Sequence, residues 1–284
     1  MSETFFQEFD QKITAFASKG KIRLGMGLAS PDDAILNSLK QVEQYAQITL
    51  VGPASIQGLK DFPVIVDPEP EVRLATLLAK GEFDAIIRGT VDDFKTYEKY
   101  TELTGEKYTF APALLASPNG FHFFLTSASN PENWQKEDRL LSSSQIAGFL
   151  QSWDVTPNLA VFSGERHETY PRKKHIREGV VGILNQTYED AEWIVKELQA
   201  QGFQAKHWAI DLNPAIEAGA NIICPVNGMV GNQVFRVLLF CGGKILFGTR
   251  LGLSKLYEDN SRTEKDFSYH VKWLAALVNK QAYA

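Results

Sequence analysis

The residues best suited to hold an anion lie near the C-terminus, in the stretch Y-E-D-N-S-R-T-E-K-D-F (257–267). Ser261 and Glu264 have the spacing of a capping box, in which a serine hydroxyl accepts from the N–H three residues on. Arg262 lies between them, although a cation in the first turn of a helix opposes the helix dipole. A guanidinium beside free N–H groups can bind a phosphate dianion. The stretch therefore predicts either a structural helix cap or an anion site at a helix start.

A second candidate is the turn N-G-M-V-G-N (227–232), which follows a predicted strand ending at Pro225 and leads into a helix predicted from Gly231. Gly228 and Gly231 would let a ligand approach the backbone closely, and Asn232 offers a side-chain amide. The turn is neither G-x-G-x-x-G nor a Walker loop, which argues against a dinucleotide or a nucleoside triphosphate. Two interpretations stay open: a phosphate-binding loop, and a tight strand-to-helix turn.

Polar residues also follow a predicted strand that ends near residue 164. Ligands of α/β proteins bind beyond the carboxyl ends of strands, which makes Ser163, Gly164 and Arg166 candidates for phosphate binding. The basic residues after them, Lys173 and Lys174 included, suit either a polyphosphate tail or a solvated loop.

Arg88 lies at the end of another predicted strand, before a helix that Thr90 could cap, and both are candidates for substrate binding. The chain shows no Ser-His-Asp order, nucleophile elbow or paired-carboxylate signature. His122 and His207 fall on strand patterns, and we interpret them as core or surface residues. The candidates indicate an anionic ligand before they indicate a reaction.

The elements that must position these residues follow a β/α rhythm, typical of a mostly parallel sheet covered by helices. Strands are predicted at 21–27, 47–52, 64–66, 84–89, 158–164, 205–209, 221–225 and 244–249, and helices at 69–80, 91–103, 137–152, 188–201, 231–241 and from near Arg262 onward. The rhythm breaks once, where 110–116 and 121–126 flank the turn S-P-N-G and predict two adjacent antiparallel strands.

Composition narrows the function classes. The 284 residues are 44% apolar and 22% charged, as in folded globular proteins, and the net charge of −5 gives no reason to expect nucleic acid or an anionic membrane as a partner. Cys224 and Cys241 lack metal-type spacing, so we expect free thiols in a reducing cytosol and no metal. The acidic N-terminus has no signal-peptide pattern, and no apolar run is long enough to span a membrane. We predict a cytoplasmic protein.

The C-terminal third resembles the phosphate acetyl/butyryltransferase family. That family reads A-N-V-L-x-F-P-x-L-x-A-G-N-x-x-Y-K, then Y-G-P-x-x-Q-G-L, then N-D-L-S-R-G, with D-G-x-V-x-G earlier in the chain. The matching segments here are A-N-I-I-C-P-V-N-G-M-V-G-N-Q-V-F-R (220–236), F-G-T-R-L-G-L (247–253), E-D-N-S-R (258–262) and D-A-I-I-R-G-T (84–90).

One branch of that family, MtxX (methyltransferase-related, methanogenesis marker protein 4), is more similar still. Its segments L-S-G-x-R, V-K-H-Y and G-x-x-G-N-x-x-F-R-x-L resemble residues 163–166, 205–208 and 228–238. The resemblance covers nearly the whole chain and is most specific from 158 to 262.

The resemblance implies an α/β fold of the isocitrate/isopropylmalate dehydrogenase type, with two α/β domains around a cleft, and a homodimer. The first domain would comprise residues 1–106 and 255–284, and the second 107–254, with the antiparallel pair. In the acyltransferases the arginine of the S-R pair holds the phosphate of an acyl phosphate, and the serine assists the tetrahedral transition state. These roles carry to Arg262 and Ser261.

Two departures from the family pattern concern catalysis. Thr263 replaces the glycine after S-R, and the position of the family's general-base aspartate falls on Ser268, which leaves Asp266 displaced by two residues. The leading hypothesis is an acyltransferase that acts on an acyl phosphate or a related anionic metabolite, with CoA as co-substrate and no covalently bound cofactor. The alternative is a non-catalytic or regulatory anion- or CoA-binding protein of the MtxX type, linked to methyltransferase systems. A dehydrogenase is disfavoured, because the metal-ligand aspartates and nicotinamide-site residues of that fold are not recognisable.

Overall fold

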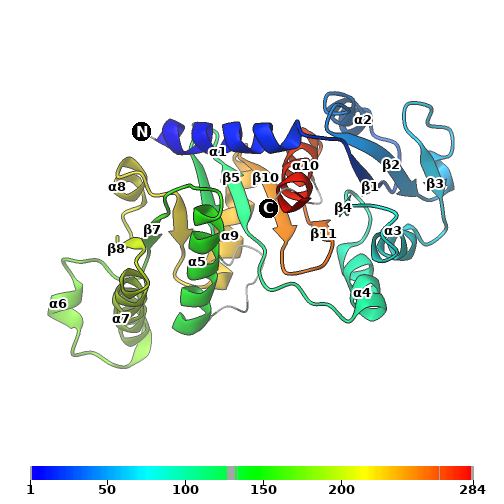
Figure 1. Ribbon diagram of the computed structural model, residues 1–284. Coiled ribbons are helices and arrows are strands. Elements are labelled where there is room, and N and C mark those ends of the chain that lie inside the picture. The colour runs from blue at the N-terminus through cyan, green and yellow to red at the C-terminus, as the bar shows by residue number, and fades with distance from the viewer. Residues whose placement is uncertain (1, 127–131, 133, 262, 283–284) are drawn as a thin grey trace. The chain divides into compact units, whose positions relative to one another are not determined.

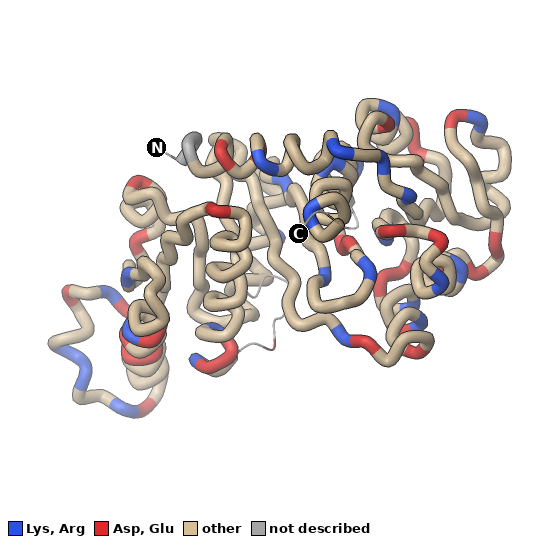
Figure 2. Tube along the Cα trace, viewed as in Figure 1, with Lys and Arg blue, Asp and Glu red and all other residues tan. Residues whose placement is uncertain are grey.

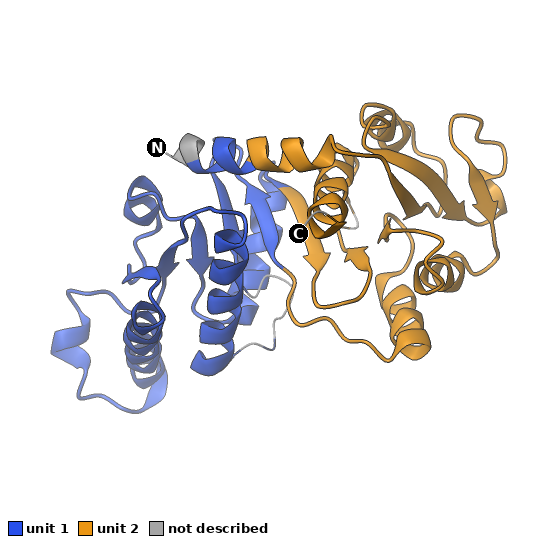
Figure 3. Ribbon diagram, viewed as in Figure 1, with its two compact units in different colours: residues 1–9, 112–244 blue, residues 10–111, 245–284 orange. Residues whose placement is uncertain are grey.

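The computed structural model describes residues 2–126, 132, 134–261 and 263–282 (Figure 1). Two compact units make up the chain (Figure 3). Unit 1 contains residues 1–9 and 112–244, and unit 2 contains residues 10–111 and 245–284. Helix α1 (Ser2–Ala17) contributes to both units. The division into two domains with a cleft between them stays a prediction.

Unit 2 is built on a sheet whose strands run parallel except for the last. The strand order is β3 (Val64–Val66), β2 (Ala46–Gly52), β1 (Ile22–Gly27), β4 (Ala85–Ile87), β11 (Leu256–Glu258) and β10 (Lys244–Arg250), with β10 antiparallel to β11. Its helices include α2 (Asp33–Lys40), α3 (Pro70–Ala79), α4 (Asp93–Thr104) and α10 (Ser268–Ala282), with a 3₁₀ turn η1 (Ala54–Ile56). Because the parallel strands end at one edge, the loops after β1, β2, β4 and β11 meet there.

The core of unit 2 comes from the buried faces of its helices against the sheet. Leu74 and Leu78 of α3, Ile86 of β4, Tyr100 of α4 and Tyr257 of β11 pack in one apolar cluster, each at most 1% exposed. Two glycines let the loops at the carboxyl edge approach each other. Gly89 has a positive φ of +60°, and a Cβ there would lie 2.0 Å from the carbonyl oxygen of Gly27.

Unit 1 repeats the α/β plan. Its strand order is β5 (Ala113–Ala116), β6 (His122–Leu125), β9 (Ile222–Cys224), β7 (Asn158–Val161) and β8 (Gln204–His207). The last four strands are parallel, and β5 is antiparallel to β6. Its helices include α5 (Lys136–Gln151), α6 (Tyr170–Lys173), α7 (Gly179–Ala200), α8 (Leu212–Glu217) and α9 (Gly228–Phe240). Phe124 packs edge-on against Phe9 and Phe149 at its centre.

The predicted α/β rhythm and the antiparallel pair are confirmed: Leu114 of β5 lies opposite Phe124 of β6. Within the described residues, no helix is long and apolar enough to cross a membrane. Two helices begin earlier than predicted, α7 at Gly179 rather than 188 and α9 at Gly228 rather than Gly231.

The start of the last helix was predicted wrongly. Helix α10 begins at Ser268, not near residue 262, and the Glu264 carboxylate accepts from the N–H groups of Lys265 and Asp266 instead of reaching back to Ser261. The physical reason is tertiary: Phe267 is fully buried, and its N–H donates to the Ser38 hydroxyl at 3.0 Å. The Asp266 carboxylate then accepts from the Ser268 N–H (3.1 Å) and hydroxyl (2.5 Å), a side-chain turn that starts the helix.

This geometry predicts which side chain stabilises the helix start. We expect Asp266→Ala to lower the free energy of unfolding by about 0.5–2 kcal/mol, as for a lost helix cap. Ser261→Ala should cost less than about 0.5 kcal/mol, because Ser261 lies in a turn seven residues earlier. Urea unfolding of both variants measures the difference. An equal or larger loss for Ser261→Ala would support the original capping box.

Candidate functional site

Arg88 ties together two loops at the carboxyl edge of the unit 2 sheet. It is 5% exposed, and its Nε donates to Asp259 Oδ1 at 3.0 Å. Its Nη2 donates to the Asn260 carbonyl at 2.5 Å and its Nη1 to the Val91 carbonyl at 3.4 Å. The guanidinium thus faces protein oxygens on three sides. Its role in this structure is to hold the loop after β11 against the loop after β4, rather than to present a free fork to a ligand.

Asn260 completes this link through its side-chain amide. Its Oδ1 accepts from the Gly89 N–H at 3.1 Å, and its Nδ2 donates to the carbonyls of Gly89 (3.1 Å) and Ser261 (2.7 Å). The backbone of Ser261 is therefore fixed next to the β4 loop. The Ser261 hydroxyl, half-buried, accepts from the Thr263 N–H at 3.3 Å and lies 3.0 Å from the Thr263 hydroxyl.

Asp259 carries the link on to a second buried arginine. The Arg250 guanidinium lies 2.7 Å from Asp93 and 3.7 Å from Asp259, and it stacks over the rings of Tyr97 (4.4 Å) and Tyr257 (4.8 Å). Burial and the nearby Asp93 carboxylate raise the pKa of Asp259. An acidic group shared by two arginines fixes the position of the Asp259–Ser261 segment.

Thr90 stabilises the loop after β1 rather than a helix. Its hydroxyl accepts from the Ala29 N–H at 2.9 Å, and the Ala29 carbonyl accepts from Ser55 after β2 at 3.0 Å. The cap of α4 is Asp92, which accepts from the Lys95 N–H at 3.0 Å, so the expectation that Thr90 caps this helix was wrong.

Arg262 and Asp266 are the two other catalytic candidates. Arg262 lies outside the described residues. Asp266 is exposed and accepts from Ser268, as described above. Through its Oδ1, this carboxylate holds the start of α10.

In unit 1, the polar residues after β7 form a chain of hydrogen bonds. The Ser163 hydroxyl, 2% exposed, lies 2.8 Å from the Glu165 carbonyl, to which it donates, and 2.9 Å from His207 Nε2. His207 Nδ1 pairs with the Glu192 carboxylate of α7. Burial is the main cause that lowers the pKa of His207, against the opposing effect of Glu192. Ser163 is thus a buried member of a Ser-His-Glu chain, not an exposed ligand.

Gly164 and Arg166 follow in the same segment. The Gly164 N–H donates to the Thr187 hydroxyl at 2.9 Å, and the Arg166 N–H donates to its neighbour Glu165 at 2.8 Å. The Arg166 side chain is exposed. Thr169 donates to the Glu165 carboxylate, and this hydrogen bond is the main cause that lowers the pKa of Glu165. Arg166 therefore presents its side chain to solvent, whereas Gly164 contributes only backbone atoms.

The basic residues 172–174 lie on and after α6, where Figure 2 shows a run of positive charge. Lys173 Nζ is 3.9 Å from Glu165 Oε2, whereas Lys174 is exposed. Asn185 of α7 donates to the carbonyls of Lys173 and Ile176, which fixes this segment. The segment 172–176 is therefore hydrogen-bonded to α7.

Helix α9 begins at an uncharged cap residue. Asn227 caps it by accepting from the Val230 N–H at 2.9 Å, whereas Asp32 and Asp92 cap α2 and α4. The Gly231 N–H already donates to the Asn227 carbonyl at 3.0 Å, so it is not available to a ligand. Gly228 is the buried first residue of α9. Asn232 Oδ1 accepts from Arg236 Nε at 2.9 Å, one turn along.

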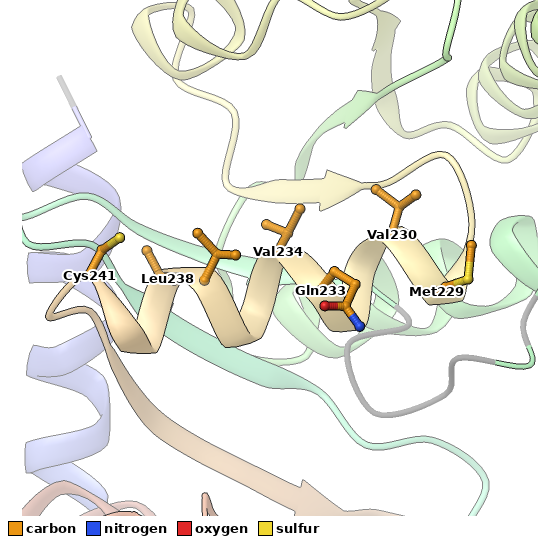
Figure 4. A pocket seen from close by; sticks show the side chains of 7 residues that line it. Met229, Val230, Gln233, Val234, Leu238 and Cys241 are labelled. Atoms are coloured by element: carbon orange, nitrogen blue, oxygen red, sulfur yellow. The ribbon is translucent and has the colours of Figure 1, made fainter.

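An open apolar groove of about 550 Å³ follows α9 (Figure 4). Val230, Val234, Leu238 and Cys241 project on one side of the helix, and no charged side chain lines the groove. Such a surface does not suit an anion. Within the described part of the chain, no group of three or more His, Cys, Asp or Glu side chains is arranged to hold a metal ion.

No protein-family model matches the chain. The mtx subunit X of Methanosarcina barkeri is 30% identical over 276 residues, which cover 93% of this chain and 97% of that protein. Its counterpart from Methanosarcina mazei is 30% identical over 282 residues, 95% and 96% of the two chains. This chain belongs to the MtxX family. The branch predicted from residues 163–166, 205–208 and 228–238 is therefore confirmed.

Solved structures show the fold that MtxX shares with phosphotransacylases. A branched-chain phosphotransacylase from Enterococcus faecalis superimposes with a TM-score of 0.63 at 17% identity, covering 91% of this chain and 99% of that one. A phosphotransacetylase from Streptococcus pyogenes gives 0.63 at 12%, over 98% and 99%. A 4-hydroxythreonine-4-phosphate dehydrogenase from Klebsiella pneumoniae gives 0.56 at 12%, over 91% and 100%. The resemblance to the phosphate acyltransferases in fold is confirmed.

Sequence analysis missed the residues that hold the site together. His207 was read as a core or surface residue, although it bonds to Ser163, 44 residues away. Asn260 and Arg250 were quoted only as parts of motifs. A signal was present for two of them: Arg88 and Arg250 lie at the end of, or directly after, a predicted strand, where polar side chains meet at a sheet edge. Asp259 follows β11, which was not predicted.

The first prediction from this geometry concerns Arg88. We expect Arg88→Met to lower the free energy of unfolding by about 1–3 kcal/mol, because the Asn260 carbonyl loses its Arg88 donor and the Asp259 carboxylate loses an ion-pair partner. Arg23→Met is the matched control: Arg23 pairs with Asp84 at 2.6 Å but is 52% exposed, and its loss should cost less than about 1 kcal/mol. Urea unfolding compares them, and equal losses would contradict the role assigned to Arg88.

The second prediction concerns pH. Burial lowers the pKa of His207, so as the pH falls the unfolded chain takes up this proton first, at about 6.5. The stability that depends on neutral His207 is complete above that pH and is lost below it. We expect the urea midpoint to fall between pH 7.5 and 5.5 by more in the wild type than in His207→Gln. The same pH dependence in both proteins would show that His207 titrates alike folded and unfolded.

Proposed function

We propose that this MtxX protein binds a small phosphate-bearing metabolite at the carboxyl edge of the unit 2 sheet and acts as a phosphate acyltransferase. The substrate would be an acyl phosphate, and CoA the thiol that gives or takes the acyl group. One observation supports the proposal most: Arg88, Asp259 and Asn260 hold the backbone of Ser261 beside the β4 loop. A rigid backbone at a strand edge is what a preorganised anion site requires.

The fold supports the same function. Two of the structures it resembles are named phosphotransacylase and phosphotransacetylase, and they are covered almost completely. The resemblance of residues 258–262 to N-D-L-S-R assigns the phosphate to Arg262 and the transition state to Ser261. The thiolate sulfur would attack the acyl carbon, the acyl–oxygen bond would break, and phosphate would leave as the oxyanion held by Arg262.

A second candidate function is binding without transfer, and the environment of Asp266 favours it. Ser268 stands at the position of the family's base, and Asp266 Oδ1 is engaged in the turn that starts α10. A thiol has a pKa of about 8.5, so a missing base would cost roughly 10²–10⁴ in rate. A protein of this kind would keep the phosphate contacts and serve as a regulatory subunit, in keeping with relatives named as subunit X of a methyltransferase.

Acyl transfer separates the two functions. We expect the wild type to convert acetyl or butyryl phosphate and CoA to acyl-CoA, and Asp266→Asn to lose about 10²–10⁴ in turnover. An asparagine carbonyl can still accept from Ser268, so the fold is retained. Glu264→Gln is the control, since Gln can keep the bonds to Lys265 and Asp266. If the wild type shows no transfer but is stabilised by phosphate, the protein is a binder.

Binding itself is tested at Arg262. We expect Arg262→Ala to weaken binding of acetyl phosphate by about 1.5–3 kcal/mol, the range for hydrogen bonds to a charged group. Isothermal titration measures this, with exposed Lys174→Ala as the control for general loss of positive charge. Unchanged affinity in Arg262→Ala would remove the phosphate role from the S-R pair.

The proposal includes a homodimer in the cytoplasm, as the family resemblance implies. The apolar groove along α9, together with the Phe240 side chain near the end of the same helix (92% exposed), offers apolar surface for a second subunit. Light scattering of the purified protein gives the subunit number directly.

A further inference from the structure

Lys265 is an exposed cation of unit 2 whose charge is only weakly held. Besides Arg262, it is the only Lys or Arg in the loop that follows β11 (residues 259–267, here called the edge loop). Its ammonium pairs with the Asp32 carboxylate at 2.5 Å, and the two side chains are 55% and 27% exposed. An ion pair this exposed contributes little to stability, because water and salt screen it. A stronger anion can therefore take the place of Asp32.

The edge loop is anchored at two places, and Lys265 lies between them. At one end, the Asn260 amide binds the backbone of Gly89 in the loop after β4. At the other end, the Phe267 N–H donates to the Ser38 hydroxyl of α2 at 3.0 Å. The edge loop therefore runs from the β4 loop to α2, and both anchors hold its backbone while the Lys265 side chain stays exposed.

Asp32 places the Lys265 ammonium among the loops that meet at the carboxyl edge of the sheet. It lies in the connection after β1 and caps α2, where its Oδ1 accepts from the first N–H groups of the helix. Its Oδ2 accepts from Lys265, and this hydrogen bond is the main cause that lowers the pKa of Asp32. The connection after β1 also binds the β4 loop, because the Ala29 N–H donates to the Thr90 hydroxyl at 2.9 Å.

A phosphate group is a better partner for this ammonium than Asp32 is. It carries up to two negative charges and three acceptor oxygens, whereas the Asp32 carboxylate carries one charge and already gives one oxygen to the cap of α2. The Lys265 side chain is a flexible stem with a point charge at its end, so its ammonium can turn from one anion to another while the backbone stays in place.

We propose that Lys265 is a second phosphate-binding cation of the unit 2 edge and that it exchanges Asp32 for the phosphate group when a ligand binds. The inference rests on the proposed function, since it takes the phosphate to lie at the Ser261–Arg262 segment of the same loop. Asp32 then acts as an internal competitor that sets the affinity of the site. A ligand gains the Lys265 contact only by displacing this carboxylate, and the exposed ion pair opposes the exchange only weakly.

The test measures acetyl phosphate binding by titration calorimetry at low ionic strength. Asp32→Ser removes the competing carboxylate and keeps a good helix cap, so it should bind about two- to fivefold more tightly than the wild type. Lys265→Met should bind at least about tenfold more weakly, in the wild type and also in the Asp32→Ser background. Lys40→Met is the matched control: Lys40 forms an exposed ion pair with Asp61 at 2.8 Å, and its loss should leave the affinity unchanged.

The double variant separates contact with phosphate from mere neutralisation of Asp32. If Lys265→Met has no effect in the Asp32→Ser background, Lys265 only neutralises Asp32 and the exchange is refuted. Unchanged affinity in both single variants refutes it too, while the proposed phosphate site stands as long as Arg262→Ala weakens binding. No binding of acetyl phosphate to the wild type would overturn the proposed function and this inference with it. Should Asp32→Ser fail to fold, Asp32→Asn, which also caps helices, takes its place.

Discussion

The ion pair between Arg88 and Asp259 is the contact on which the unit 2 edge depends. These residues are 171 positions apart, and each follows its own short parallel strand. A guanidinium can satisfy several acceptors in one plane, so a single side chain fixes Asp259, the Asn260 carbonyl and the start of α4 together. The Asn260 amide, Thr90 and the close approach of Gly27 and Gly89 then follow as consequences of two loops being held against each other.

The two units use buried arginine in opposite ways. In unit 2, Arg88 pairs with Asp259, and Arg250 pairs with Asp93 and lies near Asp259. The charges of both arginines are therefore neutralised within the fold. In unit 1, Arg139 is as deeply buried; its Nη2 donates to the Phe162 carbonyl, and it has no acidic partner among the residues that the structure describes. Burying a guanidinium without a countercharge is costly. The contrast separates arginines whose charge is paired within the fold from one whose charge is not.

Sequence reasoning could predict what depends on local pattern. The β/α rhythm and the antiparallel pair around S-P-N-G follow from periodicity and turn residues, and both are present. The start of α10 could not be read in the same way. Ser261-x-x-Glu264 satisfies a local rule, but the burial of Phe267 and its bond to Ser38, 229 residues away, set the helix start instead. Arg88 was found by its place at a strand end, whereas its partners became visible only when the strands were paired. The bond between Ser163 and His207 likewise joins two strands that the sequence does not place side by side.

The difference between local patterns and long-range contacts also matters for whether this MtxX protein transfers an acyl group or only binds an anion. Identity to the phosphotransacylases is 12–17%, yet the fold is shared over nearly the whole chain. In the loop that resembles N-D-L-S-R, the contacts that position the backbone are present, because they come from Arg88, Asp259 and Asn260. In the proposed acyltransferase, Asp266 would have to serve as the proton acceptor, because Ser268 stands at the position of the family's base. The Asp266 carboxylate accepts through Oδ1 from the N–H and the hydroxyl of Ser268 at the start of α10. Anion binding would need only the positioned backbone and its cation, whereas thiol activation would also need this carboxylate at the sulfur. Catalysis is therefore the more demanding of the two proposed functions.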